Sequence, residues 1–440
     1  MTETKEGRMP RPIRRRRIAA VAVAAVTALA LSACGGARAG SPSLTSKGPI
    51  TIWYSNNEQE VAWGKQMVAS WNADHPDQRV TAQEIPAGKT SEAVISAAIT
   101  AGNAPCLVFN TAPFAVGQFE KQGGLVDLSK FPDGDSYIEG RSGAVADQYR
   151  SAVDGDFYQL PWKSNPVVIF LNKKLLAKAG VDPTDSSLGT YAGFLAAARK
   201  IVKSGAAKVA IQPAPTNEFF QLNNDFYPLY AAASGGKQLI EDGKATFDDR
   251  TGDQVANLWR TLYKEGLSSP EQYQGDSFAD GNSAMAIVGP WAVSYYKDVD
   301  WAAIPVPTPD GMPVDDIHTF SDAKNIGMYT ACQHKGTAWD LLKYATSEDQ
   351  DSKFLDETGQ MPIRPDLATT YKTYFAEHPE YELFGSLATR TVEVPSGPNT
   401  VQEMQTFRNA WTSSVIFGNG SPADALSSAA RTIDTLEAQP

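Results

Sequence analysis

The sequence predicts an α/β protein with two lobes. Apolar strands alternate with amphipathic helices over most of the chain, a pattern that indicates βαβ units and mixed, mostly parallel sheets flanked by helices. The 440 residues are too many for one simple core, which favours two lobes. Hydrophobic residues make up 42% of the chain and charged residues 20%, as in ordinary soluble globular proteins, so most of it is expected to fold.

The N-terminus is expected to direct export. Residues 11–17 carry a cluster of arginines, and residues 18–31 form an apolar run that is short for a transmembrane span. This pattern predicts a signal peptide over residues 1–33. The sequence Leu-Ser-Ala-Cys that ends at Cys34 resembles a bacterial lipoprotein processing box. Cys34 is therefore expected to carry lipid, and residues 34–48 to form a flexible tether rich in Gly and Ser.

The chain that follows the signal peptide is acidic. Without residues 1–33 it has 32 basic and 48 acidic residues, for a net charge of −16. This balance argues against nucleic acid as a partner, because nucleic-acid binding needs a basic surface. Besides Cys34, only Cys106 and Cys332 remain, and their spacing does not fit a zinc site.

The first half of the chain alternates between strands and helices. Strands begin after Gly, Pro or Asn turns and end in polar residues, and the first helix carries Trp63, Met67 and Trp71 at four-residue spacing, which indicates a core face. Strands are expected at residues 50–54, 80–85, 106–109 and 167–171, and helices around 63–71 and at 90–101, 172–180 and 191–204. Residues 131–148 are polar and are expected to be irregular.

The second half continues with short strands and longer helices. Strands are expected at residues 209–211, 284–288, 304–309 and 326–330, the third of them running into a proline-rich turn. Helices are expected at residues 252–265, 335–346, 348–358, 400–417 and 422–438. Residues 216–233 mix amides with aromatic residues, which is unusual for a core helix, although a surface loop and helix would also explain them.

Residues 277–291 are the most informative stretch. The buried strand at 284–288 is stopped by Gly289 and Pro290, so Trp291 is expected where a strand hands over to a helix. Ligands of open α/β sheets bind at that end of the strands. By itself this leaves Trp291 as either a core residue or a ligand contact.

The sequence shows no catalytic or cofactor motif. None of the four histidines lies in a zinc-binding pattern, and there is no nucleophile elbow, dinucleotide-binding glycine pattern or P-loop. No enzyme activity, cofactor or metal is therefore expected. Aromatic residues with Asn, Asp, Lys and Arg at strand ends suit a sugar instead, whose hydroxyls donate and accept while its ring face packs on an aromatic ring. A cleft between lobes would supply the concave site.

Four stretches together resemble family 1 extracellular solute-binding proteins, the maltose-binding-protein type that serves ABC sugar importers. Residues 278–291 resemble that family's Phe…Gly-x-x-Ala-Met…Gly-Pro-Trp signature. Residues 168–175 resemble its Tyr-Asn-Lys strand, with Leu171 in place of the tyrosine. Residues 338–350 resemble its late helix pair, and residues 359–364 its Gly-x-x-Pro-x-Arg loop. The resemblance runs in one order over nearly all of residues 50–440.

The resemblance implies a type II periplasmic-binding-protein fold with the ligand in the interlobe cleft and closure by hinge motion. It places an N-terminal lobe at residues 49–163 and 320–372, and a C-terminal lobe at residues 164–319 and 373–440. The chain would cross between them near residues 163–167 and 317–322. In the same layout the end of the strand before Cys332 lies near Cys106, which implies a disulfide between the two.

The resemblance also implies a set of ligand contacts, with Trp291 as the stacking aromatic residue. Asn165 falls at the hinge where the maltose binder has a carboxylate, so the ligand is not expected to be identical. The implied ligand-binding residues are Asn57, Glu58, Asn110, Trp162, Lys163, Asn165, Asn223, Asn224, Asp225, Trp291 and Arg364.

The resulting hypothesis is a monomeric receptor, anchored by lipid on Cys34 to the outer face of the cell membrane. It would bind a sugar, as a di- or oligosaccharide, and deliver it to an ABC transporter permease. A glycerophosphodiester or other polar solute is the rival ligand, because Lys163 and Arg364 would suit an anion. The sequence also leaves open a secreted glycosidase and an adhesive lipoprotein. The signal peptide could instead be an ordinary one cut near Ala39, and its arginines leave open the general or the twin-arginine export route.

Overall fold

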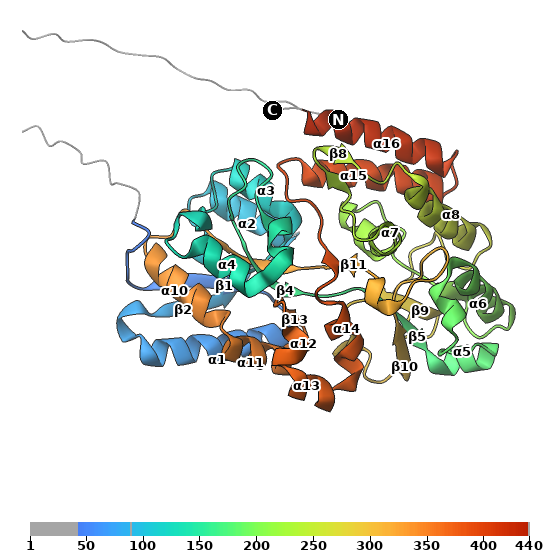
Figure 1. Ribbon diagram of the computed structural model, residues 1–440, viewed down its shortest axis with the longest axis horizontal. Coiled ribbons are helices and arrows are strands. Elements are labelled where there is room, and N and C mark those ends of the chain that lie inside the picture. Colours follow the sequence, from blue (N-terminus) through green and yellow to red (C-terminus); the bar gives the residue numbers. More distant parts are fainter. Residues whose placement is uncertain (1–42, 89, 439–440) are drawn as a thin grey trace, which may run out of the picture. The chain divides into compact units, whose positions relative to one another are not determined.

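Two mixed β-sheets organise the computed structural model, which describes residues 43–88 and 90–438. The first sheet has the strand order β13-β4-β12-β3-β1-β2. Its strands are β1 (Ile50–Tyr54), β2 (Val80–Glu84), β3 (Leu107–Thr111), β4 (Leu160–Ser164), β12 (Lys324–Met328) and β13 (Met361–Pro362). Strand β1 runs parallel to β2 and β3, whereas β12 is antiparallel to β3 and β4. Helices cover this sheet to form the first lobe (Figure 1).

The helices of the first lobe bury aromatic and aliphatic side chains on the sheet. They are α1 (Glu58–Asp74), α2 (Ser91–Thr100), α3 (Pro113–Lys121), α4 (Gly134–Ser142), α10 (Lys335–Ala345) and α11 (Glu348–Thr358), with short turns η1 (Pro76–Gln78), η2 (Leu128–Lys130) and η3 (Gly143–Tyr149). Trp63, Met67 and Trp71 of α1 are buried, as their spacing predicts. The expectation of irregular chain at 131–148 is wrong, because α4 and η3 occupy it. Helix α4 has few apolar residues, and its buried Arg141 is neutralised by Asp351 at 2.9 Å, a partner far away in the sequence.

The second sheet has the order β10-β5-β9-β6. Its strands are β5 (Val168–Asn172), β6 (Val209–Ile211), β9 (Ser283–Val288) and β10 (Trp301–Ile304). Strand β5 is antiparallel to β9 and β10, and β6 is parallel to β9. The strand expected at 304–309 is thus found earlier, because the prolines that follow Ile304 cannot donate to a sheet.

The helices of the second lobe come from the middle and the end of the chain. They are α5 (Lys173–Ala179), α6 (Tyr191–Lys203), α7 (Phe226–Ser234), α8 (Arg250–Lys264), α9 (Ala292–Tyr295), α15 (Thr400–Trp411) and α16 (Pro422–Glu437), with turns η4 (Ser186–Gly189), η5 (Phe219–Asn224), η6 (Val314–Asp316) and η8 (Thr412–Ile416) and the hairpin β7 (Ile240–Glu241) and β8 (Lys244–Ala245). Side chains of α15, such as Phe407 and Trp411, join the core beneath the second sheet. The short helices α12 (Leu367–Thr370), α13 (Lys372–Glu377) and α14 (Glu382–Leu387), with η7 (Pro379–Tyr381), lie along the chain between α11 and α15.

Three segments of chain meet where the two sheets are joined. The first links β4 to β5, the second carries β11 (Thr319–Phe320), and the third carries β14 (Thr391–Val392), which pairs in parallel with β11. The amide of Asn165 donates to Ser321 O at 2.6 Å, and the amide of Ser321 donates to Val392 O at 2.8 Å. Direct backbone hydrogen bonds therefore hold the three crossings side by side.

The predicted disulfide is confirmed. Cys106 and Cys332 are bonded, with their Cα atoms 4.5 Å apart, at the start of β3 and just beyond the end of β12. The amide of Tyr329 donates to Cys106 O at 3.0 Å, so the antiparallel pairing of these strands brings the two cysteines together. Within the described part of the chain, no helix is long and apolar enough to span a membrane.

A buried glutamate on α15 faces a second carboxyl group. Glu403 is 1% exposed and lies among apolar side chains that include Phe247, Phe407 and Ile433. Its neighbour is Glu437 at the end of α16. Burial, with the repulsion from Glu437, raises the pKa of Glu403 to about 9 from its ordinary value of 4.5. The folded protein therefore holds this proton more tightly than the unfolded chain does.

We expect the free energy of unfolding to depend on this proton. The stabilisation from a raised pKa is complete below the unfolded value of about 4.5 and is lost as the pH rises through about 9. Glu403→Gln keeps the site neutral at every pH. Between about pH 4.5 and about pH 9, the unfolding temperature of this variant should therefore fall less than that of the parent protein. Differential scanning calorimetry across the range measures this. The exposed Glu357→Gln variant should follow the parent protein, and parallel curves for parent and Glu403→Gln would contradict the assignment.

Candidate binding site

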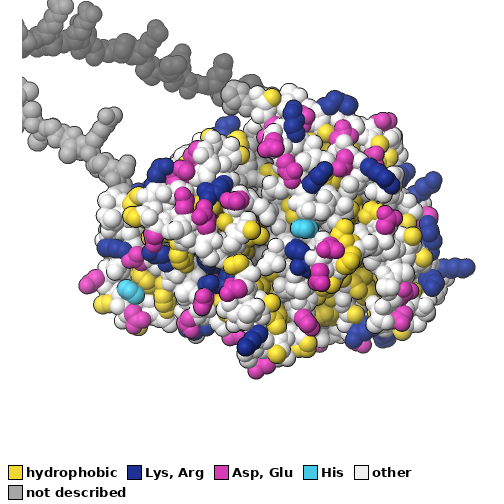
Figure 2. Space-filling model, viewed as in Figure 1, with side chains coloured by type: hydrophobic (Ala, Val, Ile, Leu, Met, Phe, Trp, Pro, Cys, Tyr) yellow, Lys and Arg dark blue, Asp and Glu magenta, His cyan; other side chains and the backbone are white. Residues whose placement is uncertain are grey.

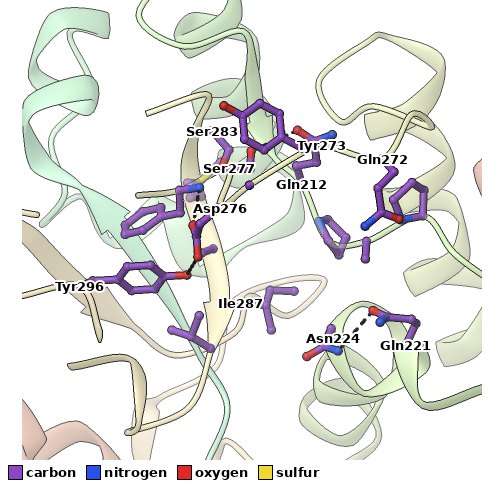
Figure 3. Close-up of a pocket in the computed structure, with 18 of the residues that line it drawn as sticks. Gln212, Gln221, Asn224, Gln272, Tyr273, Asp276, Ser277, Ser283, Ile287 and Tyr296 are labelled. Atoms are coloured by element: carbon purple, nitrogen blue, oxygen red, sulfur yellow. Dashed lines mark hydrogen bonds between the residues drawn. The ribbon is translucent and has the colours of Figure 1, made fainter. Parts of the chain in front are cut away.

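A cavity of about 360 Å³, here called the second-lobe cavity, lies at one edge of the second sheet. Its walls come from β9, from the loops at residues 212–215 and 272–278, and from η5 and Trp291. Figure 3 shows the amide side chains of Gln212, Gln221, Asn224 and Gln272 around it, together with Tyr273, Asp276, Ser277 and Tyr296. Amides and hydroxyls, which both donate and accept hydrogen bonds, make up most of this polar lining.

Hydrogen bonds hold the polar walls of the second-lobe cavity in place. Asp276 accepts from the Tyr296 hydroxyl at 2.9 Å and from the amide of Phe278 at 3.0 Å (Figure 3). Burial, and then the bond to Asp276, raise the pKa of Tyr296, which keeps its hydroxyl a donor. Gln212 Oε1 accepts from Asn282 at 2.8 Å and from Ser277 at 3.1 Å. The cavity is therefore preorganised by residues of one lobe.

A second cavity of about 260 Å³, the interlobe cavity, adjoins the first. The first lobe contributes Thr90, Glu92 and Phe114, and the second lobe contributes η5 residues and Trp291. Asp322 and Lys324, at the second crossing, line it as well. The two cavities share Asn224, Val288 and Trp291. Trp291 thus lies where they meet, and it is one of the few large hydrophobic side chains left exposed, at 36%.

The local chain explains the place of Trp291. Strand β9 ends at Val288, and Trp291 immediately precedes the short helix α9, as the Gly-Pro break predicts. A side chain at Gly289 would come within 2.9 Å of the indole Nε1 and 3.2 Å of Asn165 Cβ, so glycine is needed there. The absence of a side chain at 289 therefore leaves room for both the indole and Asn165, and Trp291 lines both cavities.

The interlobe cavity contains charges and unsatisfied acceptors. Lys324 Nζ lies 3.0 Å from Asp322 Oδ1. The backbone of Asp322 has a positive φ of 42°. Burial lowers the pKa of Lys324, but the attraction of Asp322 outweighs it and the pKa is raised. Asn165 donates to Asp322 O at 3.2 Å, while its buried Oδ1, like that of Asn223, has no partner among the described residues. Of these two residues, only Asn223 lines the interlobe cavity.

The comparisons with known proteins agree with this architecture. Residues 55–352 match a family model described as bacterial extracellular solute-binding protein. The chain belongs to this family. The family consists of binding proteins rather than enzymes.

Three similar proteins illustrate how the solute-binding protein relates to others. The diacetylchitobiose binding protein DasA of Streptomyces coelicolor is 23% identical over 390 residues, which cover 82% of this chain and 84% of that protein. The arabinooligosaccharide-binding protein of Halalkalibacterium halodurans is 24% identical over 361 residues, covering 76% and 75%. The crystal structure of the cyclic alpha-maltosyl-1,6-maltose binding protein from Arthrobacter globiformis has the same fold, with a TM-score of 0.75 at 20% identity over 89% of this chain and 99% of that one.

Two expected contacts of the solute-binding protein are part of the first-lobe core. Trp162 is buried, and its ring contacts Trp63, Phe109 and Phe354 at centroid distances of 4.7 to 5.4 Å. Lys163 is buried and paired with Glu60, and its Nζ also donates to Gln360 at 2.9 Å. Neither residue lines the second-lobe cavity or the interlobe cavity, so the contact of each with ligand stays a prediction.

Asp225 and Arg364 are likewise engaged by other residues of the protein. Asp225 is fully buried and accepts from Arg408 Nη1 at 2.6 Å and from Trp411 Nε1 at 3.0 Å. Arg364 donates to Asp351 at 2.7 Å and to Thr346 O at 3.0 Å. Neither lines the second-lobe cavity or the interlobe cavity. Both are structural charges paired across elements.

The remaining expected residues divide into two groups. Asn57 and Glu58 are exposed at the start of α1, where Asn57 caps the helix, and Asn110 forms a bulge in β3 with φ 105°. These three line neither cavity. The structure does bring together Asn223, Asn224 and Trp291 on the interlobe cavity, whereas Asn165 lies beside Gly289 and lines neither cavity. Cys34 lies outside the described residues.

Sequence reasoning missed several lining residues. Glu92 and Phe114 come from α2 and α3, and Gln212 and Lys324 from turns and crossings with no motif of their own. Only Asp276 had a signal in the sequence, because it immediately precedes the stretch at 277–291. The positions of the other lining residues depend on the order of the strands in the sheets, which no local motif shows.

The structural role of Asp225 is directly testable. We expect Asp225→Ala to lower the free energy of unfolding by about 3–5 kcal/mol, because Arg408 would remain buried without its counter-charge. Urea unfolding measures this loss. The matched variant is Asn224→Ala, the neighbouring cavity residue, whose stability should stay close to that of the parent. Equal stability of the two variants would contradict this structural role.

Proposed function

We propose that this chain binds a neutral saccharide of two or more units in the cavities beside Trp291 and delivers it to the permease of an ABC transporter. The observation that carries the proposal is the exposed indole of Trp291, which lies where a cavity lined by amides and hydroxyls meets an interlobe cavity that adds Thr90, Asn223 and several phenyl rings. A flat indole packs on the apolar face of a sugar ring, while amides and hydroxyls exchange hydrogen bonds with its hydroxyls. The saccharide ligands in the names of the related proteins support the same ligand class.

Electrostatics favour a neutral ligand over an anionic one. Lys163 and Arg364, the cations that suggested a glycerophosphodiester, are engaged by Glu60 and Asp351. Among the described residues that line the two cavities, Lys324 is the only cation, and it is paired with Asp322. Glu92 and Asp276 add further negative charge near the site. A phosphate would meet more carboxylates than cations there.

The lobe boundaries and the membrane anchor belong to the same proposal. The lobes would comprise residues 49–163 with 320–372 and residues 164–319 with 373–440, and close on the ligand. Lipid on Cys34 would hold the chain, as a monomer, at the outer face of the cell membrane. Residues near the end of the tether dock on the first lobe: Ser46 O accepts from the Gly336 amide at 2.9 Å, and Lys47 donates to Gly336 O at 2.9 Å. An anchored first lobe leaves the second lobe free to move.

The surface charge is compatible with a small uncharged ligand. Lys and Arg side chains lie among Asp and Glu side chains on the face shown in Figure 2, with no broad basic surface there. This distribution gives no support to nucleic acid as a partner.

The role of Trp291 is tested by substitution. After a thermal-shift screen of di- and oligosaccharides has found a ligand, Trp291→Ala should weaken its binding by roughly 1–3 kcal/mol, the size of a buried aromatic contact. Isothermal titration calorimetry measures the change, and Trp291→Phe should recover part of it.

The neighbouring exposed tyrosine gives a matched control. Tyr295 is 63% exposed and lines neither cavity, so Tyr295→Ala should bind the ligand as the parent does. Unchanged affinity in Trp291→Ala would exclude the stacking role. Binding of glycerophosphodiesters and of no saccharide in the screen would overturn the proposed ligand class.

A further inference from the structure

Two grooves continue outward from the interlobe cavity. The inner one, about 660 Å³, lies between α2 and α3 and reaches Phe219 of η5. The outer one, about 510 Å³, lies between α3 and the start of α15 and is here called the amide groove. Figure 1 shows α15 beside α3.

The grooves and the interlobe cavity share their walls. Phe114 lines all three, and Thr90, Glu92 and Phe219 line both the interlobe cavity and the inner groove. Gln118 and Val401 line both grooves. A continuous path therefore leads from Trp291, past the rings of Phe114 and Phe219, to the surface of α15. Those two rings meet edge to face with centroids 5.2 Å apart, so they bound the path where the lobes approach each other.

The amide groove is chemically distinct from most of the surface. None of the described residues that line it carries a charge, although 20% of the chain is charged. Its polar side chains are amides and hydroxyls, among them Gln118, Asn399, Gln402, Gln405, Thr406 and Asn409. Gln405 and Asn409 bond to each other at 3.0 Å, whereas the exposed Gln118 and Gln402 have no side-chain partner in the described structure. The amide groove therefore resembles the second-lobe cavity, because amide side chains and an aromatic ring line both.

We propose that the amide groove binds the distal units of a long, unbranched neutral saccharide whose inner end lies against Trp291. The inference rests on the proposed function and narrows it to a receptor that favours long chains over disaccharides. Amides on the groove match successive hydroxyls of the chain, and Phe114 offers a ring face along the path.

The position of the groove adds a consequence for lobe closure. Gln118 belongs to α3 of the first lobe, and Gln402 belongs to α15, which packs on the core of the second lobe. A chain that spans the groove contacts both lobes outside the central cleft. Such contacts exist only when the lobes lie close together, so each would favour the closed arrangement over an open one.

The test compares ligand length in parent and variant proteins. Isothermal titration calorimetry with short and long members of one linear series, chosen from the malto-, chito- and arabinooligosaccharides, gives both affinities. The parent should bind the long member more tightly. The double variant Gln118→Ala/Gln402→Ala should weaken binding of the long member by about tenfold, the loss of two ordinary hydrogen bonds, and leave the disaccharide unchanged.

The matched control is Gln66→Ala, an exposed amide on α1 that lines none of these cavities, and it should leave both affinities unchanged. Equal loss for short and long members, or no loss for either, would overturn the groove assignment while the saccharide site stands. A double variant that binds long chains normally but no longer supports uptake in cells would assign the groove to the permease instead. Failure of every saccharide to bind the parent protein would remove the proposed function itself.

Discussion

The backbone hydrogen bonds between the three crossings are the constraint on which the site depends. The hydroxyl of Thr319 donates to Val167 O at 2.6 Å, and the amide of Val167 donates to Phe320 O at 3.1 Å. These bonds hold the end of the first sheet against the start of the second. Since β9 pairs with β5 directly after the first crossing, they also set the position of Gly289 and Trp291.

A buried carboxyl group connects the third crossing to residues that line the interlobe cavity. Glu393, on the third crossing, accepts from the amides of Ala323 at 2.9 Å and Val394 at 2.8 Å. Burial raises its pKa to about 8. The bond to Ala323 fixes the turn in which Asp322 and Lys324 face the cavity. The charges that line the site are thus placed by a group that a ligand would not touch.

Local and long-range information explain what could be predicted from the sequence. Trp291 could be placed because the strand, the Gly-Pro break and the aromatic residue are adjacent. The core face of α1 could be predicted because its large apolar residues recur at regular spacing. The ion pairs of Lys163 and Asp225 could not be predicted, because their partners, Glu60 and Arg408, lie 103 and 183 residues away. Charged residues at strand ends look alike in sequence whether they meet a ligand or a distant ion. Helix α4 could not be predicted because it has few apolar positions. Its buried face includes Arg141, whose charge is buried because it pairs with Asp351.

The two central cavities differ in what they require of the lobes. The second-lobe cavity is walled by residues of one lobe, and its hydrogen bonds, such as Asp276 with Tyr296, persist whatever the first lobe does. The interlobe cavity needs Glu92 and Phe114 from the other lobe. A ligand held at Trp291 gains these first-lobe contacts only when the lobes are close, and a ligand shifts an equilibrium only by such differential contacts. In the proposed binding mode the second lobe therefore supplies the preformed part of the site, whereas first-lobe residues that no sequence motif revealed would couple binding to closure.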